Sequence, residues 1–96
     1  MDGGATDESY NLVFTAVKAV EGVKNPHRTR MRKTGGLWDI DIDIEVQPDI
    51  TVREAHGIAV NVEKAIRNAL SDVFDIVVHV EPYGDNRAGE QYGVSK

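Results

Sequence analysis

Residues 38–47, WDIDIDIEVQ, constrain the fold most strongly, because acidic and apolar side chains alternate there without a break. The acids are Asp39, Asp41, Asp43 and Glu45, and the residues between them are isoleucines. A period of two predicts a β-strand with one buried face and one acidic face. Side chains on the acidic face lie about 6–7 Å apart along the strand. Their mutual repulsion calls for cations nearby, either arginines on a neighbouring strand or a metal ion.

The segment before the acidic strand supplies arginines. Residues 27–33, HRTRMRK, alternate in the same way, and Thr34-Gly35-Gly36 is typical of a hairpin turn. A two-residue turn at Gly35-Gly36 predicts three rungs of opposite charge, which cross-strand pairing favours. The rungs are Arg32–Asp39, Arg30–Asp41 and Arg28–Asp43. In this register His27 lies on the face opposite the acids, and it reaches Asp43 only if the start of the strand twists, bulges or pairs differently.

Two amphipathic helices are predicted on either side of this hairpin. Residues 7–22 form the first, and Gly22 can end it. Its apolar stripe is Leu12, Ala16, Ala19, Val20 and Val23. Thr51-Val52-Arg53-Glu54 is a capping box that opens the second helix, which runs to about Leu70. Its apolar stripe is Val52, Ala55, Ala59, Val62, Ile66 and Leu70.

Residues 75–81 form a third strand, which Pro82 closes because proline cannot extend a ladder. The order helix, strand, strand, helix, strand predicts an α+β domain of the ferredoxin-like or metallochaperone-like αββαβ type. Both helices cover one face of a three-stranded sheet. We assign residues 1–6 to a linker, 7–82 to the domain and 83–96 to a disordered tail. A domain this small is marginally stable alone, so we expect it to form a homodimer.

Composition excludes several classes of function. The net charge of −5 argues against nucleic acid as a partner. The absence of cysteine excludes disulfides and thiolate metal sites. Neither a signal peptide nor an apolar run of the roughly 20 residues of a membrane span is present, so the chain taken alone is expected to be soluble and cytosolic. No catalytic triad or phosphate-binding loop is recognisable, and an enzyme is not expected.

The remaining candidates are metal ligands. His79 and Glu81 point to the same side of the third strand, so this pair is expected to form the centre of a metal site. Asp41 or Asp43 can add an oxygen if the second and third strands are close, and His56 is a further imidazole at the start of the second helix. Such a set suits Zn, Mn or Fe(II). On the alternative interpretation these residues are a solvated surface, and the arginine ladder alone neutralises the acids.

The motifs of the chain resemble the C-terminal cytosolic domain of cation diffusion facilitator transporters. The resemblance covers residues 7–82. It is carried by the His-x-x-x-x-Arg run before the double glycine, by TVREAH at the second helix and by the closing VVHVEP. It implies a homodimer on the cytoplasmic side of a cell inner membrane or magnetosome membrane, attached to a membrane domain of the same chain. It also implies export of divalent cations, with metal near the dimer interface favouring transport.

The resemblance further implies a ligand set. The zinc-transporter pattern falls on His27, Asp43, His56, His79 and Glu81. The family often has His at the position of Asp43, so this chain departs toward an oxygen-rich site, which leaves Fe(II) and Mn open beside Zn. Trp38 beside an acid resembles the iron-associated magnetosome branch, in which the site acid matches Asp41. The alternative function is a structural dimerisation or protein-docking module that has lost its metal site.

Overall fold

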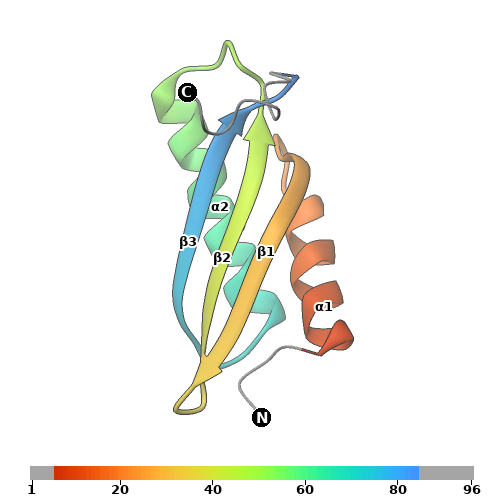
Figure 1. Ribbon diagram of the computed structural model, residues 1–96. Coiled ribbons are helices and arrows are strands. Elements are labelled where there is room, and N and C mark those ends of the chain that lie inside the picture. Colours follow the sequence, from red (N-terminus) through yellow and green to blue (C-terminus); the bar gives the residue numbers. More distant parts are fainter. Residues whose placement is uncertain (1–5, 85–96) are drawn as a thin grey trace, which may run out of the picture.

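The computed structural model describes residues 6–84, which form two helices and a three-stranded sheet (Figure 1). The elements are α1 (Asp7–Lys18), β1 (Lys24–Thr34), β2 (Leu37–Val46), α2 (Val52–Ala69) and β3 (Val73–Pro82). The strand order is β1-β2-β3; β1 pairs antiparallel with β2, and β2 pairs parallel with β3. Figure 1 shows both helices behind the sheet, on one face. The predicted αββαβ fold is therefore confirmed.

The capping box fixes where α2 begins. The Thr51 hydroxyl accepts a hydrogen bond from the Glu54 amide at 3.0 Å, and the Glu54 carboxylate accepts one from the Thr51 amide at 2.9 Å. These bonds satisfy two amides that a helix start leaves without partners. Val62 and Ile66 of the predicted stripe are fully buried. Val52, the first residue of α2, is 86% exposed and was wrongly included in the stripe.

The predicted stripe of the first helix was right at Val20 and Val23, which pack against the core, and was off by one position within α1. Val13 and Val17 are fully buried, whereas Leu12 is 44% exposed. Apolar residues occur as adjacent pairs along this helix, so two stripes with the same spacing exist, about 100° apart. Packing against α2 and the sheet selects the valine stripe. The helix also ends at Lys18, before Gly22, and the connection to β1 turns at Gly22 with φ of 93°.

Strand β2 lies at the centre of the core. Its even-numbered side chains, from Trp38 to Val46, are buried. Because both helices lie behind the sheet (Figure 1), these side chains face the helices, and the alternating acids face the open side. The buried apolar side chains are Val13, Val17, Met31, Trp38, Ile40, Ile42, Ile44, Val46, Val62, Ile66 and Ile76. Alternation in the sequence thus becomes a division between a packed face and a charged face.

Ordered structure extends just beyond the predicted end of the domain. The Tyr83 amide donates to the Val46 carbonyl at 2.8 Å, and the Lys24 ammonium lies 5.2 Å from the centre of the Tyr83 ring. Thr6, assigned to the linker, is instead the N-cap of α1, where its hydroxyl accepts from the Ser9 amide. Residues 1–5 and 85–96, which carry most of the predicted linker and tail, lie outside the described residues.

Candidate metal centre

Two register shifts in β1 determine which side chains meet the acidic strand. Arg32 pairs with Asp39 and Arg30 with Asp41, as predicted. Between Arg30 and His27 the register shifts, so that His27, rather than Arg28, is the Cα partner of Asp43. Arg28 adopts φ of 51°, in the left-handed region where a β-bulge can place its extra residue. The third predicted rung is therefore wrong at the backbone level, because the strand bulges.

The bulge brings His27 to the acidic face. Its Nδ1 lies 2.7 Å from the carbonyl oxygen of Asn25, which makes Nδ1 the protonated nitrogen in the neutral ring. The other nitrogen, Nε2, then presents a lone pair, and it lies 3.6 Å from Glu81 Oε1 and 3.9 Å from Asp43 Oδ2. From the sequence, we expected His27 to reach Asp43 only if the start of the strand twists, bulges or pairs differently. The bulge meets this condition.

The parallel pairing of β2 and β3 brings the remaining candidates together. Asp43 is the Cα partner of His79, and Glu45 is that of Glu81, so the two strands present their polar side chains side by side. The Nε2 atom of His79 lies 2.8 Å from Asp41 Oδ1, a distance at which the imidazole N–H donates to the carboxylate. Asn25 adds a hydrogen bond of 3.0 Å to Glu45 Oε2.

Two groups of possible ligands result. His27, Glu45 and Glu81 form the first, and Asp41, Asp43 and His79 form the second; within each, one ligand atom per residue lies within 4.8 Å of the others. The structure thus places His79 and Glu81, the expected centre of one site, in different groups. The reason is the roughly 6–7 Å between side chains i and i+2 on a strand, which is long for one ion.

The ligand groups in the structure differ from the predicted ligand set at two residues. Glu45 joins the first group, although it was noted only as one acid of the strand; its place in the alternating run was the available signal. His56 belongs to neither group, because it is exposed on α2, in the layer behind the sheet. Within one chain the structure therefore brings together five of the six predicted residues and leaves His56 apart.

Burial and charge distinguish Asp43 from the other candidates. It is the one buried charged residue within residues 6–84, at 6% exposure. Its Oδ2 atom lies 3.3 Å from Arg28 Nε, and this is the single arginine–carboxylate contact of the described part of the ladder. On two rungs of the arginine ladder, the arginine and the acid are thus partners in the strand register only. Within the described residues, an arginine of the ladder contacts a carboxylate directly only at Asp43.

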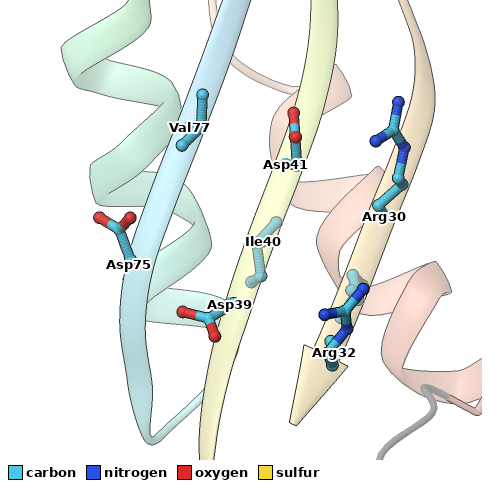
Figure 2. A pocket seen from close by; sticks show the side chains of 8 residues that line it. Arg30, Arg32, Asp39, Ile40, Asp41, Asp75 and Val77 are labelled. Atoms are coloured by element: carbon cyan, nitrogen blue, oxygen red, sulfur yellow. The ribbon is translucent and has the colours of Figure 1, made fainter. Parts of the chain in front are cut away.

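A shallow groove of about 260 Å³ continues along the same face toward the hairpin turn. Figure 2 shows Arg30 and Arg32 on β1 across from Asp39 and Asp41 on β2, with Asp75 on β3. No imidazole lines this groove. The ligands that transition metals prefer are therefore concentrated at the other end of the sheet, where β1 begins and β2 and β3 end.

The donor set defines the chemistry available. Each group offers one imidazole nitrogen and two carboxylates, a nitrogen- and oxygen-rich set that suits Zn, Mn or Fe(II). In the first group a lone-pair nitrogen and two carboxylates converge, so three acceptors meet with no hydrogen between them. A divalent cation can bind all three, and the partial exposure of His79 and Glu81 leaves a path from solvent.

No helix within residues 6–84 has both the length and the apolar character needed to cross a bilayer. Residues 5–83 match the family described as "Cation efflux protein, cytoplasmic domain". The chain is 33% identical over 76 residues to the manganese efflux system protein MneP of Bacillus subtilis, which covers 79% of this chain and 25% of that protein. The chain thus spans about a quarter of the length of that relative.

Solved structures point to the same family of cytoplasmic domains. The metal-bound C-terminal domain of the CzcD transporter from Thermotoga maritima superposes with a TM-score of 0.76 at 34% identity, covering 82% of this chain and 92% of that one. A nickel form of the MamM C-terminal domain carrying D249N gives 0.76 at 26% identity, covering 80% and 98%. Because these relatives represent different branches, iron and the magnetosome membrane stay predictions. The chain belongs to the family of cytoplasmic domains of cation efflux proteins, the cation diffusion facilitators.

Proposed function

We propose that this chain is the regulatory, metal-sensing domain of a divalent-cation efflux transporter, acting on the cytoplasmic side of its membrane. The single observation that carries the proposal is the convergence of His27, Asp43 and Glu81 from three different strands. Acceptor atoms gathered in this way are stabilised by a cation. The two ligand groups adjoin through Asp43, so we propose that they form one extended centre for Zn, Mn or Fe(II).

Homodimerisation belongs to the same proposal. The open face of the sheet carries the ligands. Among residues 6–84 no helix covers this face, and β3 is an edge strand of the described sheet. His56 lies in the helix layer, so we propose that it reaches the centre from a second copy of the chain. An ion whose ligands come from two copies stabilises the arrangement that completes its coordination. Metal would then draw two domains together and favour the transport-active state of the attached membrane domain.

Calorimetric titration with Zn and Mn, and with Fe(II) under anaerobic conditions, tests the proposal. The native chain should bind saturably, and His79→Ala and Glu81→Gln should each weaken binding by about tenfold or more. Glu63→Gln, a change of equal charge on α2, is the matched control and should leave affinity unchanged. Small-angle scattering should show the dimer become more compact with metal.

The alternative, a purely structural dimerisation or docking module, makes a different prediction for the same experiment. It expects a dimer by sedimentation with no saturable metal binding. Such a result would refute the sensor function and support the scaffold. Metal binding that His79→Ala and Glu81→Gln leave intact would instead place the site elsewhere in the chain.

A further inference from the structure

We propose that Arg28 sets the metal affinity of this centre by competing with the incoming cation for the carboxylate of Asp43. The inference rests on the proposed function, since it concerns how that same site responds to metal. Arg28 is not a ligand, because a guanidinium has no lone pair to offer a cation. It acts instead as a resident positive charge that the ion has to displace.

The geometry puts guanidinium and metal in competition for one atom. Arg28 Nε lies 3.3 Å from Asp43 Oδ2, and the same oxygen lies 3.9 Å from His27 Nε2. This is the carboxylate oxygen that faces the imidazole, so an ion held by His27 and Asp43 would take it. Arg28 and the ion would therefore need the same carboxylate oxygen, and one of the two has to leave.

Burial makes the competition unequal. The Asp43 side chain is 9% exposed, whereas that of Arg28 is 61% exposed. Asp43 therefore stays in the site and depends on a cationic partner there, while Arg28 can withdraw into water on its flexible stem. A guanidinium remains charged at every pH the protein meets. Without metal it neutralises Asp43; with metal its charge repels the ion until the side chain swings away.

The backbone at this position does not call for arginine. Arg28 has φ of 51°, a conformation that glycine or asparagine adopts at lower cost than a long side chain does. The bulge that turns His27 toward the acids would therefore form at least as well with glycine. The contribution of Arg28 lies in its guanidinium, and the contact with Asp43 is the ion pair it makes within residues 6–84.

The test compares metal affinity in matched arginine variants by calorimetric titration with Zn and Mn. Arg28→Gln and Arg28→Gly should each bind about tenfold more tightly than the native chain, as expected for removing a unit charge close to a divalent ion in water. Arg28→Gly keeps the backbone conformation available and covers the case in which glutamine disturbs the bulge. Arg28→Lys, which restores the charge, should return affinity toward the native value.

Arg32→Gln is the control, because it removes the same charge from the same strand at the far end of the groove. It should change affinity by less than about twofold, since screening by salt weakens distant charges. In ¹H–¹⁵N spectra the Arg28 Nε–H signal, assigned by its loss in Arg28→Gln, should shift toward that of a solvent-exposed arginine as metal is added. A structural role alone would leave that signal unmoved.

The outcomes separate this inference from the function on which it rests. Tighter binding in both Arg28 variants than in the native chain, but not in Arg32→Gln, supports it. Native binding with equal affinity in every arginine variant overturns the role of Arg28 and leaves the metal sensor standing. Absence of binding in the native chain and in all variants overturns both.

Discussion

Substituting Gly22 by alanine tests how closely the turn between α1 and β1 packs against α2. Gly22 has φ of 93°, in the left-handed region, and a Cβ added there would lie 2.6 Å from Cδ1 and 3.1 Å from Cγ1 of Ile58. Ile58 in turn packs against the core. Gly22 therefore allows both the backbone turn and the close approach of this turn to α2. The same turn leads directly into the strand that carries His27.

Two costs and one gain set the expected magnitude. An L-residue in the left-handed region costs about 1–2 kcal/mol. Moving the Ile58 side chain off its preferred rotamer costs about 0.5–1.5 kcal/mol. The reduced entropy of the unfolded chain returns about 0.4–1 kcal/mol. The net destabilisation should be about 1.5 kcal/mol, which corresponds to a fall in Tm of roughly 6–12 °C for a domain of this size.

Urea denaturation at fixed chain concentration measures this free energy of unfolding, because oligomerisation makes stability concentration-dependent. Combining Gly22→Ala with Ile58→Val, which removes Cδ1, should recover about 0.5–1 kcal/mol relative to additivity. Gly57→Ala is the matched control. It lies inside α2, a Cβ there meets nothing within 4 Å, and alanine should stabilise the helix by about 0.5–1 kcal/mol. Native stability in Gly22→Ala, or additivity with Ile58→Val, would refute the reasoning.

Three further predictions follow from packing, pairing and ligand chemistry. Val13→Ala, at a fully buried site, should cost about 2 kcal/mol in urea denaturation, whereas Leu12→Ala should cost less than about 0.5 kcal/mol; the reverse order would restore the stripe predicted from sequence. Arg30→Gln should change the free energy of unfolding by less than about 0.5 kcal/mol, since the Arg30 guanidinium contacts no carboxylate among residues 6–84. A fall in Tm of many degrees would show that the arginine ladder stabilises the hairpin. Calorimetric affinity for Zn should fall as the pH is lowered, because an imidazole must be neutral to bind metal; a pH-independent affinity would exclude imidazole ligands.

Sequence patterns were sufficient for the fold because each element carries its own local signal. The strand β2 is predicted by its unbroken alternation, the start of α2 by its capping box, and the hairpin by its double glycine. The family match supports the same fold. Family membership also agrees with the expectation that the chain is not an enzyme, since the family consists of transporter domains.

What the sequence could not supply depends on tertiary packing. The rotation of α1 was ambiguous because Leu12 and Val13 are both apolar, and packing against α2 and the sheet decides between them. The β1 bulge gave little local signal, since arginine is an uncommon residue at a positive φ. The bulge was raised only as one possibility for His27, so the simple hairpin register placed Arg28 opposite Asp43 and left His27 uncertain. The distribution of His79 and Glu81 between two groups likewise depends on how β3 aligns with β2.

The mixed pairing of the sheet also has a consequence for the order in which the centre can assemble. Strands β1 and β2 are joined by a tight turn, so closing that loop costs little entropy, and His27 can meet Asp43 early. Strand β3 is parallel to β2 and can pair only after the chain has passed through α2, which makes its contacts non-local and slower to form. His79 and Glu81 therefore arrive last. An early hairpin offers a metal only part of its coordination, so tight capture of an ion would mark a chain that has finished folding.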